Sequence, residues 1–178
     1  LFKGSEVDVL VNGGLDFSDE ILARLDYVVA SVHSSLGKDE AKNTARVIKA
    51  ISNPYVTILG HPTGRLLLSR EGMSLDMNAV LEAAAETRTI VELNCTPSRM
   101  DLDWRYWKSA TQKGVLCAID PDAHSTPELD QVRMGVNIAR KGWLTASNIL
   151  NTRKSADVEK FFRTPKPKRV MGPGARGR

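Results

Sequence analysis

The sequence is poor in the residues that usually carry chemistry or cross-links. Among its 178 residues only three are histidine, His33, His61 and His124, and only two are cysteine, Cys95 and Cys117. Both cysteines lie within or just after apolar segments, which predicts buried thiols rather than a disulfide. Two cysteines are also too few for a zinc ribbon, so a cysteine-rich zinc site is excluded.

Long apolar runs are missing as well. No stretch approaches the roughly 18 uncharged residues that a membrane-spanning helix requires, and the N-terminal LFKGSEVDVL lacks the organisation of a signal peptide. Hydrophobic residues make up 42% of the chain and charged residues 26%, as in ordinary globular domains. We therefore expect a single cytoplasmic domain that makes no contact with membranes.

Acidic residues are absent from the last part of the chain. The formal net charge is +4, and the segment TPKPKRVMGPGARGR (164–178) contains five basic residues and no acid. Its proline and glycine content predicts a basic disordered tail that follows a nearly neutral domain over residues 1–163. Such a tail either contacts nucleic-acid phosphates or only aids solubility, and the sequence leaves both interpretations open.

Short apolar runs rich in β-branched residues alternate with helical patterns along the chain. The runs cover residues 6–11, 26–32, 55–60, 89–94 and 114–119. Helical patterns cover 39–51 and 76–87, the second with Asp76 as a predicted N-cap. This alternation predicts an α/β fold, in which helices cover a parallel sheet that is either doubly wound or closed into a barrel.

Each histidine follows one of the predicted strands. His33 follows 26–32, His61 follows 55–60, and Asp122 and His124 follow 114–119. The carboxyl ends of parallel strands share one face of the sheet, so these side chains should converge there. Any one of them is also explained as a hydrogen-bonded loop residue. Their shared position favours a catalytic site for zinc, manganese or iron.

Several motifs, in their order and spacing, resemble a known domain. They are GSEVDVL, DYVVASVHS, NPYVTILGHPTGRLL, TIVELN, DPDAHST and GVNIARKGWLTASNILNTR. Together they are similar to the C-terminal two-thirds of a PHP (polymerase and histidinol phosphatase) domain, over about Lys3 to Phe162. They resemble most the PHP domain at the C-terminus of bacterial and archaeal family X DNA polymerases.

The resemblance implies a distorted (β/α)7 barrel with a trinuclear metal centre that hydrolyses phosphoesters. At the matching positions Glu6 would bridge two metals, His33 would bind one of them and Asp122 the other. His61 and His124 would serve the third metal. The resemblance also makes Asp122 and His124 the predicted catalytic pair. Alternate residues of an extended strand end point the same way, which would let these two side chains bind different metals. Without the resemblance, Glu6 would be interpreted as a solvent-facing acid.

Other candidates are weighed between two interpretations. Arg65 and Lys141 either bind substrate phosphates or form surface salt bridges. Cys95, next to Asn94, is interpreted as a packing residue. The alternatives are a soft metal ligand and a residue that supports the ligands from behind. Asp120 is left without a role. The aromatic cluster 104–107 is interpreted as helix packing rather than as a platform for an unpaired base.

The H-x-H motif that opens a PHP domain does not occur in this sequence. The chain begins with Leu1 at the equivalent of about the third strand, so we expect a fragment of a longer protein. A barrel without its first strands exposes sheet edges, which leads to the expectation of a homodimer that completes the barrel.

Two classes of function follow. The first is a phosphoesterase that uses Mn²⁺, Zn²⁺ or iron, with up to three ions in the full family site and fewer here. It would act on DNA as a 3′–5′ exonuclease in repair, or on small molecules as histidinol phosphatases do. The second is a truncated, non-catalytic scaffold, which the missing H-x-H favours.

Overall fold

A five-stranded parallel sheet forms the centre of the protein in the computed structural model, which describes residues 1–172. The strands pair in sequence order, and each overlaps one of the predicted apolar runs. The predicted α/β class with a parallel sheet is therefore confirmed. The strands are β1 (Gly4–Asp8), β2 (Tyr27–Ser31), β3 (Ile58–Leu59), β4 (Ile90–Asn94) and β5 (Cys117–Asp120).

Helices follow the strands, and the two predicted helices are both present. Asp76 caps the second of them by accepting a hydrogen bond from the Ala79 N–H at 3.1 Å, as predicted. The described part of the chain also has five 3₁₀ segments, at Trp104–Tyr106, Thr126–Gln131, Ala146–Asn148, Leu150–Thr152 and Lys166–Lys168. The helices are α1 (Asp19–Leu22), α2 (Glu40–Ser52), α3 (Met77–Thr87), α4 (Trp107–Gln112), α5 (Val132–Lys141) and α6 (Ser155–Arg163).

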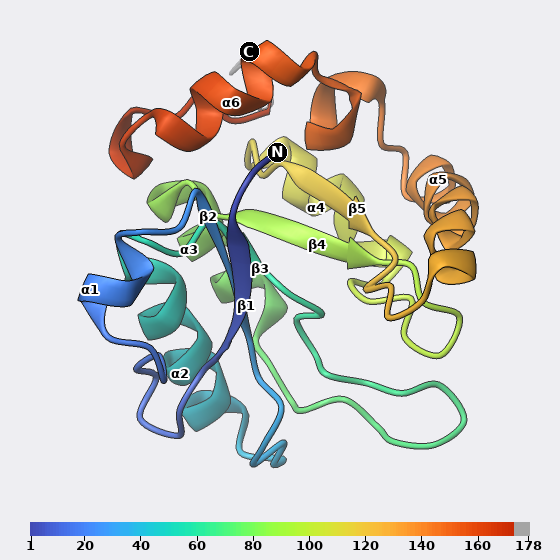
Figure 1. Cartoon of the computed structure of the whole chain (residues 1–178). Helices are drawn as coiled ribbons and strands as arrows, with labels where there is room; N and C mark the ends of the chain where they lie inside the picture. Colours follow the sequence, from blue (N-terminus) through green and yellow to red (C-terminus); the bar gives the residue numbers. More distant parts are fainter. Residues whose placement is uncertain (173–178) are drawn as a thin grey trace.

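The larger hydrophobic core lies between one face of the sheet and the helices that cover it (Figure 1). Val7, Val28 and Val91 face it from the strands, because alternate residues of a strand point to the same face. Trp107 is fully buried in this core, which confirms packing for that member of the aromatic cluster. Cys117 is a buried free thiol in the same core, and Cys95 is another, so no disulfide forms.

A second core fills the opposite face near the amino ends of the strands. There α6 lies across the strand ends (Figure 1), and Phe162 stacks on Tyr27 with ring centroids 5.2 Å apart. This face of the sheet is thus apolar at its amino end and closed by a helix. The buried members are Ile58, Ile90, Leu116, Ala118, Leu150 and Phe161.

Residues 164–172, expected to belong to a disordered tail, pack against the domain instead. Lys166 is only 6% exposed, and its ammonium donates to the backbone oxygens of Ile51 at 2.5 Å and Asn53 at 3.0 Å. These two backbone oxygens lie at the carboxyl end of α2, where no following helical N–H can donate to them. A lysine, whose long apolar stem can be buried while its ammonium donates to them, therefore suits this position. The rest of the predicted tail, 173–178, lies outside the described residues.

The sheet is open along β1. Within residues 1–172, the outer edge of β1 meets only an antiparallel bridge between Val9 and Leu15 at its end. At the other edge, Ile149 forms a parallel bridge with Cys117. Closure of a barrel by a second copy stays a prediction. The described helices include none that is long and apolar enough to cross a membrane.

Candidate metal centre

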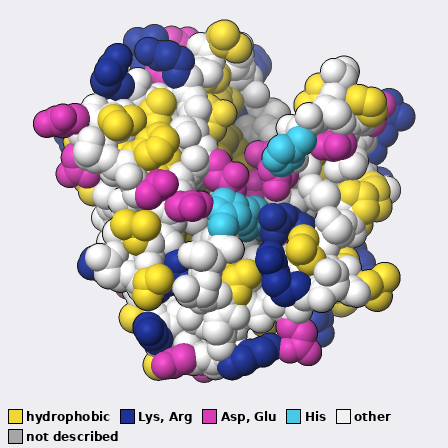
Figure 2. Space-filling view, turned by 60° about the horizontal axis from the view of Figure 1, so that its bottom comes forward, with side chains coloured by type: hydrophobic (Ala, Val, Ile, Leu, Met, Phe, Trp, Pro, Cys, Tyr) yellow, Lys and Arg dark blue, Asp and Glu magenta, His cyan; other side chains and the backbone are white. Residues whose placement is uncertain are grey.

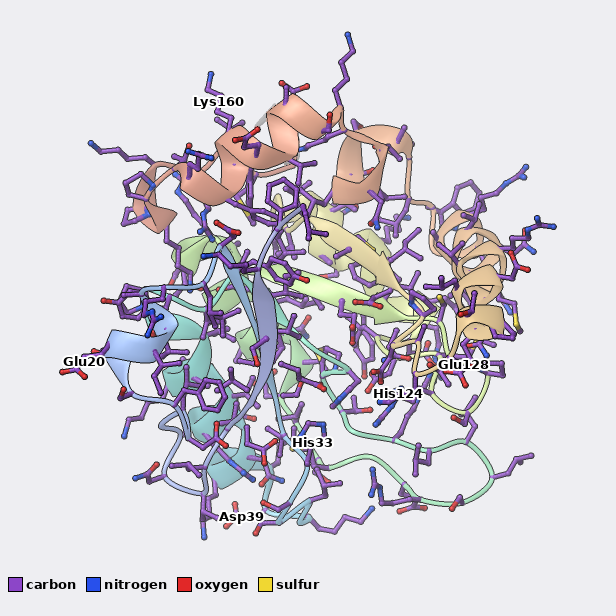
Figure 3. The ribbon with its side chains drawn as sticks, viewed as in Figure 1. Glu20, His33, Asp39, His124, Glu128 and Lys160 are labelled. Carbon is purple, nitrogen blue, oxygen red and sulfur yellow. The ribbon has the colours of Figure 1, made fainter. Side chains whose placement is uncertain are left out.

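Histidine and acidic side chains gather at the carboxyl ends of the strands, on one face of the molecule (Figure 2). His33 and His61 each follow a strand by two residues, β2 and β3 respectively, as the sequence predicts. Figure 3 shows His33 and His124 on this side of the molecule, away from α6. The parallel sheet therefore delivers residues distant in sequence to one rim.

Three of the predicted ligands form a compact cluster. Glu6 Oε1 lies 3.1 Å from His61 Nε2 and 3.5 Å from His33 Nε2, and the three potential ligand atoms lie within 4.8 Å of one another. The hydrogen bond from His61 lowers the pKa of Glu6 to about 2, against the opposing effect of burial. The cluster thus combines an ionised carboxylate with two imidazoles, a donor set that suits zinc, manganese or iron.

Asp8 orients one of these imidazoles. Its Oδ1 lies 2.5 Å from His33 Nδ1, so the carboxylate holds the proton on Nδ1 and leaves Nε2 free to face Glu6. A carboxylate that fixes the far nitrogen in this way is the usual outer partner of a histidine ligand. Glu6 and Asp8 share a face of β1, which explains how one strand supplies both a ligand and its support.

Arg46 of α2 ties the two loops of this cluster together. The buried guanidinium donates to the backbone oxygens of Val9 and Leu10 after β1, and to that of Ser34 next to His33. Burial lowers the pKa of Arg46. Sequence reasoning missed this residue, because its helical position at 46 looks like any other charged position of an amphipathic helix.

Glu92 of β4 is a second residue that sequence reasoning missed. Its side chain is buried, and its Oε2 accepts a hydrogen bond from the backbone N–H of His61 at 2.5 Å. Burial, together with the charge of Asp120, raises the pKa of Glu92 well above its usual value. The sequence signal is an acid inside the otherwise apolar TIVELN, in a strand buried along its whole length.

Asp101 supports the loop that carries His61. Its Oδ2 accepts hydrogen bonds from the N–H and hydroxyl of Thr63 and from the Gly64 N–H, at 2.9 to 3.1 Å. Its Oδ1 and the Nδ1 of His61 are both buried and have no hydrogen-bond partner in the described residues. Orphaned polar atoms beside a carboxylate and histidine cluster fit a site built to take a ligand.

The structure places Asp122 and His124 differently from the extended strand end that the sequence analysis expects. β5 ends at Asp120, and Asp122 has a φ of 52°, in the left-handed region, so the alternation argument for this pair is wrong. Asp122 Oδ2 lies 3.2 Å from Asn94 Nδ2. The His124 side chain is 79% exposed and lies outside the three-residue cluster, with its Nδ1 3.9 Å from Asp122 Oδ1. Their roles as ligands stay predictions.

The two predicted phosphate-binding residues contact protein groups. Arg65 donates to the backbone oxygens of Arg99 and Met100 and forms an ion pair with Asp103 at 2.9 Å. Lys141 Nζ lies 4.6 Å from the centroid of the Trp104 ring. Their predicted contacts with substrate therefore gain no support from this geometry.

Cys95 and Asp120 now have definite surroundings. Burial raises the pKa of Cys95 to about 11, and a Cβ on Gly135 would lie only 2.8 Å from the Cβ of Cys95. This close contact with α5 matches the packing interpretation. Asp120 accepts a hydrogen bond from the Asp122 N–H at 2.8 Å, and burial raises its pKa. Its side chain is therefore turned into the rim.

No family model matches the chain, but individual known proteins are similar to it. A DNA polymerase/3′-5′ exonuclease PolX of Bacillus subtilis (strain 168) is 42% identical over 163 residues, which cover 92% of this chain and 29% of PolX. A probable phosphatase of Thermoanaerobacter sp. (strain X514) is 32% identical over 162 residues, 85% of this chain and 64% of that protein. One from Caldanaerobacter subterraneus subsp. tengcongensis is 30% identical over 182 residues, 97% and 68% respectively. The chain thus spans less than a third of PolX and about two-thirds of the phosphatases.

Proposed function

The chain belongs to the family of the probable phosphatase from Caldanaerobacter subterraneus subsp. tengcongensis and is similar to part of PolX. On that premise we propose that residues 1–163 form a metal-dependent phosphoesterase domain of the PHP type. The observation that carries the proposal is the cluster of Glu6, His33 and His61 at the rim of the parallel sheet. We propose further that it acts on the 3′ ends of DNA in repair, as the exonuclease part of a longer family X polymerase-like protein.

The chain's own residues supply binding and orientation. Glu6, His33 and His61 would hold a divalent ion, which when bound makes hydroxide available near neutral pH and acts as a Lewis acid toward phosphate oxygens. Asp8 holds the His33 ring through Nδ1, so that Nε2 is directed at Glu6. The Glu92 carboxyl accepts a hydrogen bond from the backbone N–H of His61, and so holds the second imidazole in place.

Asp122 and His124 complete the proposed site. Asp122 is held by the Asn94 amide and by Arg99, whose Nε lies 3.7 Å from its Oδ2, so its carboxylate has a defined orientation. The exposed His124 would reach a further ion or the substrate from its loop. Manganese, zinc or iron fits these nitrogen and oxygen donors.

A small phosphate monoester is the second candidate substrate. It is favoured because the alignments cover 64% and 68% of two probable phosphatases but only 29% of PolX. In both cases the same ion and the same ligands would serve, and only the substrate-binding loops would differ.

The test is metal content by mass spectrometry, combined with Mn²⁺-dependent hydrolysis of a single-stranded oligonucleotide labelled away from its 3′ end. The second substrate is p-nitrophenyl phosphate. We expect bound metal and hydrolysis in the wild type, and loss of both in His61→Ala; Asp122→Ala should abolish hydrolysis. Asn78→Ala, at an exposed position of α3, is the control and should behave as wild type.

The outcomes separate the candidates. Shortening of the oligonucleotide supports exonuclease action, and turnover of p-nitrophenyl phosphate alone supports a small-molecule phosphatase. A folded protein that holds no metal and hydrolyses neither substrate would overturn the proposal in favour of a non-catalytic scaffold.

A further inference from the structure

Basic residues are concentrated at the end of the domain that α6 covers. Residues 153–172 contain seven basic and two acidic residues, whereas residues 1–152 contain 16 basic and 19 acidic residues. The acidic residues of the metal centre lie at the carboxyl ends of the strands, and α6 lies across the amino ends (Figure 1). Lys160 projects outward from α6 on the side away from His33 and His124 (Figure 3).

The basic side chains line two adjoining grooves. One groove lies between α6 and the segment that follows it. Arg153, Lys160 and residues 168–170 line it, together with one acidic residue, Asp157. The other is lined by Arg88 and Lys113, and again by residues 168–170. Because they share that segment, the two grooves form one continuous surface, which we call the basic track. Its six basic residues are Arg88, Lys113, Arg153, Lys160, Lys168 and Arg169.

Some of these basic side chains are engaged in contacts within the protein, and others are free to bind a ligand. Arg153 and Arg169 lie over the Phe161 ring, at 5.4 and 5.2 Å from its centroid. Arg169 is buried and donates to the backbone oxygen of Thr164, so it is a structural member. Lys160 and Lys168 are exposed and form no ion pair within residues 1–172. These two ammonium groups are therefore free to meet a ligand.

We propose that the basic track binds the sugar-phosphate backbone of nucleic acid at a surface separate from the metal centre. The carboxylate of the metal centre does not attract a polyanion when no metal is bound, so binding of a phosphate chain without metal needs cations elsewhere on the molecule. Exposed lysines along a groove match a chain of phosphates, while the exposed apolar residues that line the track are Pro167 and Val170. A membrane surface would require a larger apolar or aromatic face beside the cations.

The binding should depend on salt and not on base sequence. Lysines contact phosphates as point charges, and the track presents no exposed aromatic side chain on which a base could stack. Each phosphate contact releases counterions, so the logarithm of the affinity should fall linearly with the logarithm of the salt concentration.

The experiment measures binding of the whole chain to a fluorescent DNA duplex by anisotropy, in EDTA and at several NaCl concentrations. The double variant Lys160→Gln/Lys168→Gln should bind at least about tenfold more weakly, with a salt slope smaller by about 2. The matched control is Lys42→Gln/Lys108→Gln, which removes the same charge from exposed positions of α2 and α4 and should leave the slope unchanged.

Because EDTA removes metal and no hydrolysis is measured, failure of the phosphoesterase proposal would leave this result unaffected. Equal loss in both double variants would overturn the proposal by assigning binding to net charge alone. Binding to phosphatidylserine vesicles without binding to DNA would also overturn it, since the track would then be a membrane surface. Circular dichroism of both double variants verifies that they are folded.

Discussion

One face of the sheet, the face opposite the larger core, changes from apolar to polar along its strands. It is apolar at the amino ends of the strands and charged at their carboxyl ends, only a few residues away. On β4, Ile90 lies in the apolar cluster under α6, while Glu92 and Asn94, on the same face, reach the rim. On β1, Glu6 aligns with Val29 and Asp8 aligns with Ser31, so polarity increases in the same direction. Apolar packing at the amino end of this face stabilises the fold. The carboxyl end holds charged groups close together, and a bound ligand or a proton would offset their repulsion.

The first prediction concerns the apolar end and has the largest effect. Leu116→Ala should lower the free energy of unfolding by about 2–5 kcal/mol, because the side chain is fully buried and leaves a cavity. Urea denaturation followed by circular dichroism measures the change. Metal affinity of the folded variant should stay near that of wild type, and a large loss of it would mean that the two ends are not independent.

The second prediction makes the converse change at the rim. Glu6→Gln should weaken metal binding by about 100-fold or more, since loss of an outer partner alone costs about 10–100-fold. The free energy of unfolding without metal should fall by about 1–2 kcal/mol at neutral pH, because the amide oxygen still accepts from His61 but the charge that this partly exposed contact favours is lost. A competition titration with a chelating dye measures affinity, with Glu20→Gln on α1 (labelled in Figure 3) as the control. Unchanged affinity would remove Glu6 from the ligand set.

The third prediction tests whether Asp8 acts through His33. Asp8→Ala should weaken metal binding by about 10–100-fold, and Asp8→Asn by less, because the amide oxygen still accepts from Nδ1–H. Long-range ¹H–¹⁵N NMR should show a mixture of His33 tautomers only in Asp8→Ala. The exposed Asp16→Ala is the control. A wild-type tautomer in Asp8→Ala would contradict the role assigned to Asp8.

The fourth prediction uses pH at the α6 end. Burial lowers the pKa of Lys166 from 10.5 to about 7. Between these two pH values the Lys166 side chain is therefore protonated in the unfolded chain but deprotonated in the folded protein. The free energy of unfolding should therefore rise between about pH 7 and 10, by up to about 1.4 kcal/mol per pH unit relative to Lys166→Met. Below pH 7 the difference should be constant. Parallel stability curves across the whole range would refute the shift.

The fifth prediction is the smallest and concerns Arg65. Arg65→Lys should cost about 1–2 kcal/mol of stability, because the fork that binds two backbone oxygens and Asp103 is lost. KM for p-nitrophenyl phosphate should not change, since these donors are already engaged. A several-fold rise in KM with unchanged stability would restore Arg65 as a phosphate-binding residue.

Local patterns were sufficient for the general architecture. The alternation of β-branched runs with helical segments predicts the parallel sheet, and the position of His33 and His61 just after two strands predicts their convergence with Glu6, which the family resemblance supplies. These inferences succeed because strand periodicity is local, and because the carboxyl ends of parallel strands share one edge whatever the order of the strands.

Other features were decided by tertiary structure. Lys166 is buried because the end of α2 offers it carbonyl acceptors, although its segment looks like a disordered tail. Asp122 turns into the left-handed region where an extended strand was expected. The sequence by itself determined the parallel sheet and the edge at which the chemistry lies, whereas the sequential order of the strands came from the structure. Only the fold decided which polar groups are buried and which carboxylate faces which imidazole, because these depend on contacts between residues far apart in the chain.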